Sequence, residues 1–266
     1  EGTITSDVTL AAGNTYKLSG EYIVEEGATL HIEEGVKIIA VYDDIADYIL
    51  VKQGGKINAV GTPDKPIVMT SEKEEPGAWG GIHICGRAHT NAEGGKGSSE
   101  IGGAVYGGND DADNSGTLQY IRLEYTGFAF DEEHEANGIS FYGVGNGTIV
   151  DHCQAYKGSD DGFEFFGGSV NVSNLVAVSC SDDSFDWTEG WNGKGTNLVA
   201  YQEDKSTLGY DCDCLMECDN NGSNNAATPV AHPVLKNLIL VGNGGSKQGI
   251  RLRAGTEVEI DNAKVC

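Results

Sequence analysis

The chain has 266 residues, enough to bury one sizeable core or two small ones. Its 17 basic and 41 acidic residues leave a formal net charge of −24, which argues against binding to phosphate backbones and favours cations as ligands. The sequence contains no apolar stretch near the roughly 20 residues that cross a bilayer. The opening EGTITSDVTL has neither an initiating Met nor a signal peptide, so we expect a mature or trimmed chain.

Residues 1–78 read as short strands separated by turns that contain Gly. Examples are EYIVEEGATLHIEEGVKI and YILVKQGGKINAVGTPDKPIVMTS. The chain shows no long stretch with the 3.6-residue period of a helix. We therefore predict that 1–78 form the N-terminal coils of a β-solenoid. A β-sandwich is the competing fold, although sandwiches do not need similar segments at a fixed spacing.

Residues 86–118 are predicted to form a looped insertion. Within it, NDDADNSG places Asp111, Asp113 and Ser115 at alternate positions before a Gly, as at the opening of a calcium-binding loop. Arg122 stands where an EF-hand needs its bidentate Glu, so a complete EF-hand is excluded. We expect either a separate Ca²⁺ loop closed by distant ligands or an ordinary polar loop.

Alternating apolar residues followed by Gly recur in NGISFYG, DGFEFFG, DSFDWTEG and QGIRLRAG. Gly138 and Gly162 are 24 residues apart, and Gly162 and Ser184 are 22 apart. Gly249 follows 65 residues after Ser184, which is close to three such periods. Coils of about 22–24 residues predict an all-β fold, a parallel β-solenoid that forms a single domain over residues 1–266.

Two of these segments, GSDDGFEFFGG and CSDDSFDWTEG, carry matching acids. In each strand we expect the two aromatic side chains to point inward and the acid between them to point outward, because side chains alternate along a strand. Equivalent residues of adjacent coils stack about 4.8 Å apart. The stacking is expected to bring together six carboxylates: Asp160, Asp161, Glu164, Asp182, Asp183 and Asp186.

Two like charges about 5 Å apart repel by roughly 3 kcal/mol at an effective dielectric constant near 20. Several such pairs can coexist only if a cation binds between them, some of the carboxylates are protonated, or the side chains spread apart. Ca²⁺ takes six to eight oxygens in loose geometry and suits carboxylates from turns, so we predict Ca²⁺ as the cofactor. The alternative is ordinary turn chemistry, in which Asp side chains bond to nearby backbone amides.

A family resemblance extends this interpretation. GATLHIEEG, GGKINAVGTPDKPIVMTS and PGAWGGIHICG resemble the opening coils of bacterial cell-surface and secreted right-handed parallel β-helix proteins of the pectin-lyase-like kind. GGNDDADNSGTLQYIRLEYTG and GSDDGFEFFGG are similar to later segments of that group. The resemblance covers most of residues 1–200. It implies a right-handed helix and an extracellular or cell-surface location, but most members have no assigned activity.

Residues 201–266 depart from the resemblance and are rich in Cys. Seven cysteines without a paired CxxC pattern predict disulfides in an exported protein. A thiolate metal site is the alternative for CDCLMEC, but it lacks a second CxxC or a His to complete it. Because the count is odd, at least one Cys is free or pairs with another chain. The disulfide candidates are Cys153, Cys180, Cys212, Cys214, Cys218 and Cys266, the last being the obvious unpaired one.

Catalysis on polysaccharides is the main functional alternative. GSDDG resembles the Asp-Asp element of polygalacturonase-type hydrolases, but their Asn-Thr-Asp and Gly-His-Gly elements are missing and Arg253 replaces a Lys. A lyase needs a base beside its metal, and Arg251 and Arg253 are expected about three coils from the acids. The aromatic residues Tyr142, Phe166 and Trp191 could stack on sugar rings, although covering the side of the solenoid is the favoured interpretation.

These observations favour a non-enzymatic protein. We predict a secreted or surface-displayed β-helix with a structural or adhesive role, stabilised by Ca²⁺. Its expected partners are copies of itself stacked end to end, a surface glycan or another surface protein. The alternative is a hydrolase, a lyase or a glycan-binding module that uses the Asp-rich face.

Overall fold

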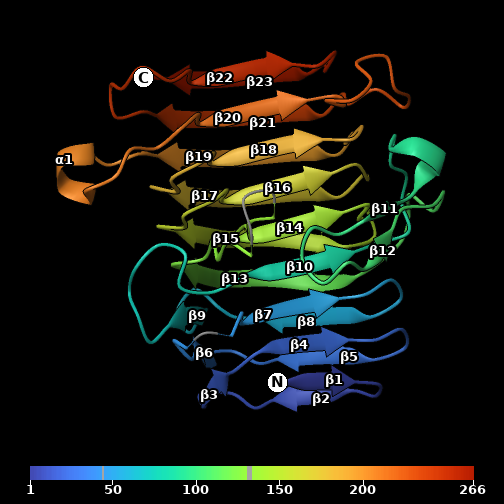
Figure 1. Cartoon of the computed structure of the whole chain (residues 1–266), viewed down its shortest axis with the longest axis vertical. Helices are drawn as coiled ribbons and strands as arrows, with labels where there is room; N and C mark the ends of the chain where they lie inside the picture. Colours follow the sequence, from blue (N-terminus) through green and yellow to red (C-terminus); the bar gives the residue numbers. More distant parts are fainter. Residues whose placement is uncertain (44, 131–133) are drawn as a thin grey trace.

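The computed structural model describes residues 1–43, 45–130 and 134–266. Within these ranges nearly all regular structure is short strands, which stack from the N-terminal end to the C-terminal end of an elongated solenoid (Figure 1). The strands of successive coils pair in parallel. The chain therefore forms the predicted right-handed parallel β-helix and not a sandwich. No helix within the described ranges is long and apolar enough to span a membrane.

One face of the solenoid is a parallel sheet, here called sheet A, which has nine strands in the described residues. In spatial order these are β1 (Gly2–Ile4), β4 (Glu21–Val24), β7 (Tyr48–Val51), β10 (Ile82–Cys85), β14 (Ile139–Tyr142), β16 (Phe163–Phe166), β18 (Phe185–Thr188), β20 (Met216–Asp219) and β22 (Ile250–Arg253).

The other faces form sheet B, whose main path is β2 (Val8–Leu10), β5 (Thr29–Ile32), β8 (Lys56–Val60), β13 (Gly116–Glu124), β15 (Ile149–Tyr156), β17 (Asn171–Val178), β19 (Lys194–Tyr201), β21 (Val234–Val241) and β23 (Glu259–Val265). Three further strands, β3 (Thr15–Leu18), β6 (Lys37–Ala40) and β9 (Ile67–Ser71), join it through β13. The first half of β13 pairs with β8 and its second half pairs with β9, so one long strand continues two faces.

The last four long strands of sheet B each bend at one residue with positive φ. Asn174, Asn197, Asn237 and Asn262 occupy this position in β17, β19, β21 and β23. Asn tolerates the left-handed conformation better than most residues. The amide Nδ2 of Asn197 donates to Oδ1 of Asn174 (2.8 Å), and the same bond links each later pair of the four. The stacking of coils thus offsets the strained backbone at each bend with a hydrogen bond between Asn side chains of neighbouring coils.

The interior of the solenoid is filled by files of stacked apolar side chains. Phe163 and Phe165 of β16 and Phe185 and Trp187 of β18 are buried, which confirms the predicted inward orientation. The rings of Phe163 and Phe185 stack 5.6 Å apart, and that of Phe165 lies 4.1 Å from Trp191. Apolar burial contributes about 25 cal/mol per Å², so these large rings are a main source of stability.

The predicted spacing holds for the central coils but not for the last ones. Phe163 pairs with Phe185 22 residues later, as expected. Phe185 then pairs with Met216, and Met216 pairs with Ile250, which are steps of 31 and 34 residues. The 65-residue interval is therefore two long coils and not three short ones. The extra residues form excursions, one of which carries the helix α1 (Lys205–Leu208).

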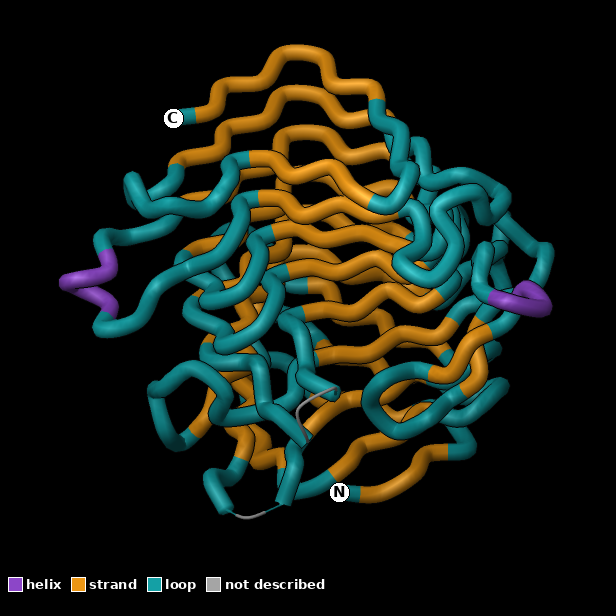
Figure 2. Tube along the Cα trace, turned by 45° about the horizontal axis from the view of Figure 1, so that its top comes forward, coloured by secondary structure: helices purple, strands orange, loops and turns teal. Residues whose placement is uncertain are grey.

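A second excursion lies between β10 and β13, where the looped insertion was predicted. It contains the 3-10 turn η1 (Glu93–Gly95) and the hairpin β11 (Gly97–Ser98) and β12 (Val105–Tyr106). In Figure 1 it projects from the side of the solenoid opposite to α1, and Figure 2 shows its loops gathered beside the strands. Ile101 and Tyr106 from this excursion are buried against Tyr142 and Phe166 of sheet A.

We expect Phe165→Ala to lower the free energy of unfolding by about 3–5 kcal/mol, because it removes a ring packed on Phe141 and Trp191 and leaves a cavity. Urea unfolding measures the loss. Tyr201→Ala is the matched control, since Tyr201 is 45% exposed, and should cost less than about 1 kcal/mol. Equal costs for the two variants would contradict the packing described.

Candidate functional site

Polar side chains on the outer surface of sheet A form one row that runs from coil to coil, here called a file. Ser140, Glu164, Asp186, Glu217 and Arg251 occupy directly paired positions on β14, β16, β18, β20 and β22. Parallel pairing holds neighbouring members one strand spacing apart, about 4.8 Å. The predicted stacking of Glu164 on Asp186 is therefore present.

A second file occupies the turn that leads into each of these strands. Oδ1 of Asn137 accepts from the backbone N of Asp161 (3.2 Å), and Oδ1 of Asp161 accepts from N of Asp183 (2.8 Å). Oδ1 of Asp183 accepts in turn from N of Cys214 (2.7 Å). Each side chain bonds to the backbone of the next coil, so Asp161 and Asp183 do have the turn role that the sequence offered as an alternative. In both Asp161 and Asp183, these bonds are accepted by only one of the two carboxylate oxygens, Oδ1.

Members of the two files and neighbouring turn residues together form three groups of close ligand atoms within the described residues. In each group, one atom per residue lies within 4.8 Å of the others. The groups are Asp161 with Glu164 and Asp186, Asp160 with Asp161 and Asp182, and Asp183 with Asp213 and Cys214. The structure thus places five of the six predicted carboxylates in two groups that share Asp161, and the sixth, Asp183, in the third group. It adds Asp213 and Cys214, which the sequence did not assign to this cluster.

Burial shifts the acids toward their protonated forms. Desolvation, followed by the charges of Glu135 and Asp182, raises the pKa of Asp160 to about 7. Desolvation and the neighbouring Asp182 raise the pKa of Asp183 to about 8. The pKa values of Asp161, Glu164 and Asp186 are raised well above their usual range, again by burial and then by other carboxylates. The cluster therefore retains protons near neutral pH unless a cation replaces them.

Two arginines lie closer to the acids than the sequence indicated. Arg251 Nη1 is 2.7 Å from Glu217 Oε2, and Arg253 Nε is 2.8 Å from Asp219 Oδ1. Both arginines are on β22, two strands from β18, because the last coils are long. The expected distance of about three coils therefore holds from Glu164 on β16, whereas Asp186 on β18 is only two coils away. Their guanidinium groups neutralise the acids at the C-terminal end of the file.

The excursion between β10 and β13 covers part of this surface. Thr90 Oγ1 and Tyr106 Oη both donate to Oε2 of Glu189, at 2.7 and 2.8 Å. Glu100 from the same excursion accepts from Tyr142 Oη (3.3 Å), and burial raises its pKa to about 7. It also contributes to the raised pKa of Glu164.

The three aromatic candidates for sugar stacking are buried. Tyr142 and Phe166 point outward from sheet A but pack beneath the excursion, and Trp191 lies in the main core. They are 0%, 7% and 1% exposed, so none presents a ring face to a ligand. The favoured interpretation, that they cover the side of the solenoid, describes Tyr142 and Phe166.

Asp111, Asp113 and Ser115 lie apart from the acidic cluster. Oδ1 of Asp111 accepts from His89 Nδ1 (2.7 Å), and Oδ2 of Asp113 accepts from the backbone N of Arg87 (2.7 Å). Ser115 is buried, and its backbone N donates to Thr148. These bonds hold the excursion in place, and no group of three close ligands in the described ranges includes Asp111 or Asp113. A Ca²⁺ loop at this position stays a prediction.

The predicted disulfides are absent. All seven cysteines lie in the described residues and all are free. The candidates Cys153, Cys180, Cys212, Cys214 and Cys218 are buried, and Cys266 is exposed. The prediction was wrong because these cysteines belong to separate turns and strands and lie beyond bonding distance of one another.

Residues 2–266 match a protein-family model described as a Pectate-lyase like beta helix domain. The match extends through residues 201–266, which the resemblance seen in the sequence did not reach. No curated protein matches the chain.

The pKa shifts predict a pH dependence. A carboxyl whose folded pKa is raised stabilises the fold fully below its unfolded pKa, and this contribution is lost as pH rises through the folded value. For Asp160 that window runs from about pH 4 to about pH 7. In metal-free buffer, Asp160→Asn should match the wild-type melting temperature near pH 4 and exceed it at pH 8. A constant difference between the two proteins across this range would contradict the assignment.

Proposed function

The chain belongs to the pectate-lyase-like β-helix family, and from that premise we propose that it is a calcium-binding structural β-helix displayed outside the cell. The observation that carries this proposal is the first group of close ligands. Asp161, Glu164 and Asp186 present oxygens within 4.8 Å of one another from two adjacent coils.

Calcium suits this geometry. Ca²⁺–oxygen bonds of 2.3–2.6 Å allow two ligands of one ion to lie up to about 5 Å apart. Asp161, Glu164 and Asp186 satisfy that limit, and Asp160 and Asp182 extend the oxygen-rich surface from the turn. Water would complete the six to eight ligands. The ion would replace the protons that burial otherwise imposes on these groups.

A structural role follows from where the acids lie. Asp161 already joins its coil to the next through the backbone of Asp183, so an ion between Glu164 and Asp186 would cross-link the same two coils. The excursion that carries Glu100 covers the neighbouring surface. Such an ion would stiffen the stack while remaining poorly accessible to a large substrate.

We expect Ca²⁺ to raise the stability of the wild-type protein by about 2.7 kcal/mol when free Ca²⁺ is a hundredfold above its dissociation constant. Glu164→Gln should be at least as stable as wild type in chelator, because it removes a buried carboxyl that must either hold a proton or carry a repulsive charge, and should gain little from Ca²⁺. Melting temperatures with and without a chelator measure both effects.

Glu74→Gln, at an exposed carboxylate outside the cluster, is the matched control for charge and should keep the wild-type response to Ca²⁺. A wild-type melting temperature that changes with neither chelator nor Ca²⁺ would contradict the calcium site.

A polysaccharide-active enzyme is the second candidate, favoured by the family and by the pairing of Glu164 with Asp186. Inverting hydrolases hold their carboxyl groups roughly 6.5–9.5 Å apart to admit a water, whereas retaining enzymes hold them about 5–5.5 Å apart. Carboxylate oxygens of Glu164 and Asp186 lie within 4.8 Å of each other, which is closer to the separation in a retaining enzyme. Fold alone does not transfer an activity, so this candidate depends on the acids themselves.

Incubation with acidic polysaccharides separates the two candidates. If the protein is structural, reducing ends and unsaturated products should stay at the level of a protein-free blank, with or without Ca²⁺. Product release that disappears in Glu164→Gln and in Asp186→Asn, with both variants folded, would replace the structural proposal with the enzymatic one.

Location and partners are also part of the proposal. A place at the cell surface is supported by the resemblance of the opening coils to secreted proteins, while the cysteines give no support because all are free. Copies of the chain, a surface glycan or another surface protein are the proposed partners. Electron microscopy of the purified protein would distinguish single particles from end-to-end stacks.

A further inference from the structure

The bend between the two halves of the long strands of sheet B changes its residue type in two coils. Asn occupies the bend in β17, β19, β21 and β23, whereas Tyr120 occupies it in β13 and His152 in β15. Both residues have a φ of 52°, in the left-handed region that bulky side chains rarely adopt. Strained backbone of this kind clusters at functional sites, so the two rings are candidates for a role beyond folding.

The two rings are held in fixed positions. They stack on each other with centroids 4.5 Å apart and planes inclined by 19°. His152 Nδ1 lies 2.9 Å from Oδ2 of Asp151. The other oxygen of that carboxylate accepts from Ser173 Oγ (2.8 Å) and Asn174 Nδ2 (2.7 Å). Asp151 therefore fixes the imidazole ring through one nitrogen, and Nε2 has no partner within the described residues.

A surface pocket of about 210 Å³ opens beside these rings. Both rings line it together with residues of the strand halves that follow the bend and of the loop before β9: Arg122, Gln154, Val176, Pro63 and Pro66. Arg122 and Gln154 are directly paired on β13 and β15, about 4.8 Å apart. Pockets for drug-sized ligands measure roughly 300–1,000 Å³, so this one suits a smaller molecule.

Arg122 brings an unpaired positive charge to the pocket. The other three arginines, Arg87, Arg251 and Arg253, each form an ion pair with a carboxylate. Arg122 forms none with any residue that the structure describes, although the chain has 41 acidic residues and only 17 basic ones. A guanidinium without a counter-charge is therefore an exception in this protein.

The acids nearest to Arg122 in the chain leave this charge available. Glu124 lies on the same face of β13, two residues later, but it neither pairs with Arg122 nor lines the pocket. Asp64, in the loop before β9, does not line the pocket either. Asp151 is already engaged by its three partners. The guanidinium group thus keeps the planar set of donors that fits a carboxylate from a ligand.

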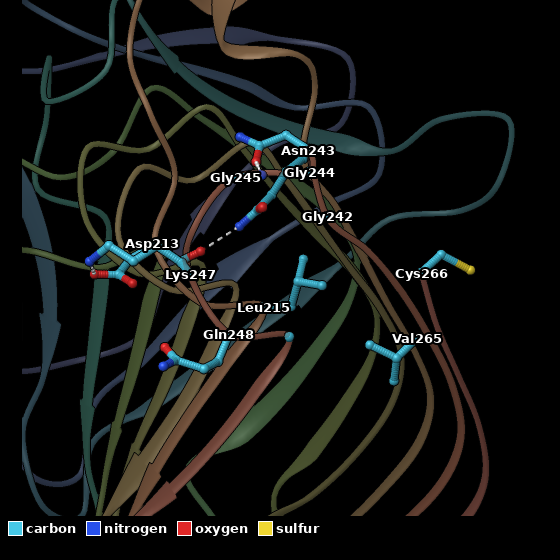
Figure 3. Close-up of a pocket in the computed structure, with 12 residues that line it drawn as sticks. Asp213, Leu215, Gly242, Asn243, Gly244, Gly245, Lys247, Gln248, Val265 and Cys266 are labelled. Atoms are coloured by element: carbon cyan, nitrogen blue, oxygen red, sulfur yellow. Dashed lines mark hydrogen bonds and ion pairs between the residues drawn. The ribbon is translucent and has the colours of Figure 1, made fainter.

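A cavity elsewhere in the molecule contrasts with this pocket. It measures about 240 Å³ and lies between Asp213 and Lys247 on one side and Val265 and Cys266 on the other (Figure 3). Lys247 Nζ is 2.6 Å from Oδ2 of Asp213, so the positive charge in that cavity is already neutralised. The pocket beside Arg122 is the one that offers an uncompensated cation next to apolar walls.

We propose that the pocket beside Arg122 binds a small organic acid, in which a carboxylate is attached to an apolar or aromatic body. The guanidinium group donates two parallel hydrogen bonds to the carboxylate. The body of the ligand lies against the two prolines and the rings of Tyr120 and His152. These rings occupy the bend in place of Asn because they form the wall of the site.

This site is separate from the proposed calcium site. The acids of that site lie on the outer surface of sheet A and in the turns that lead into its strands, whereas the pocket lies at the bend of sheet B. The two sites also take ligands of opposite charge. Either proposal can therefore fail while the other stands.

Benzoate is the probe, and the whole chain is the protein tested. Titration followed by proton NMR should shift the ring resonances of His152 along one saturable curve, and the spectrum of His152→Asn identifies those resonances. Benzamide, which lacks the charge, should bind at least about tenfold more weakly. Acetate, which lacks the ring, should also bind at least about tenfold more weakly. Equal binding of benzoate and either analogue would overturn the proposal.

Arg122→Met should weaken benzoate binding at least about tenfold, and Arg122→Lys, which keeps the charge without the planar fork, should weaken it several-fold. Lys194→Met is the matched control, because it removes an exposed cation outside the pocket and should leave binding unchanged. Glu164→Gln should also bind benzoate as the wild type does, which distinguishes failure of the calcium proposal from failure of this one.

His152→Asn separates a role in binding from a role in the fold. It should weaken benzoate binding while keeping or raising the melting temperature, because Asn suits the left-handed bend. A lower melting temperature with unchanged benzoate binding would mean that the ring serves the bend alone and would overturn the proposal. Wild-type His152 resonances that do not respond to benzoate, or an Arg122→Met protein that binds it as the wild type does, would overturn it as well.

Discussion

Parallel stacking of coils in register is the constraint on which the other features of the molecule depend. It sets every residue directly against its equivalent on the next coil, about 4.8 Å away. Inside, the rings of Phe163 and Phe185 stack for this reason. At the bend, Asn174 and Asn197 bond to each other for the same reason. On the outer surface the same geometry sets Glu164 against Asp186, where like charges repel.

The fold tolerates the repulsion through several local arrangements. Asp161 and Asp183 each accept a backbone N–H from the following coil, which stabilises their charged forms. Arg251 neutralises Glu217 at the end of the file. Burial raises the pKa of Asp160 to about 7, so protonation removes charge at lower pH. At the centre of the cluster, Asp161, Glu164 and Asp186 must hold either protons or a cation, which is why a cation is the central element of the proposed function.

The acidic surface combines oxygen-only ligands with one group that contains sulfur. Asp161 and Glu164 offer a hard cation the oxygen ligands that it prefers, whereas Asp213 beside Cys214 is paired with Lys247. Asp183 joins the two regions, because its carboxylate accepts from the backbone of Cys214 while Asp161 accepts from its own. Membership of the pectate-lyase-like family accounts for the scaffold, and the chemistry depends on the residues that this chain places on it.

The sequence by itself determined the local pattern: alternation predicted that Phe163 and Phe165 point inward and Glu164 outward, and the 22-residue repeat predicted the register of β16 with β18. Both are short-range properties that a strand's period of two encodes directly. The tertiary structure alone decided that Asp213 and Cys214 join the acids, that Tyr142 is covered and that no cysteines pair. The number of residues in the loops differs from coil to coil, so spacing in the sequence does not tell which coil a residue belongs to. The burial of a side chain depends on segments far away in the chain.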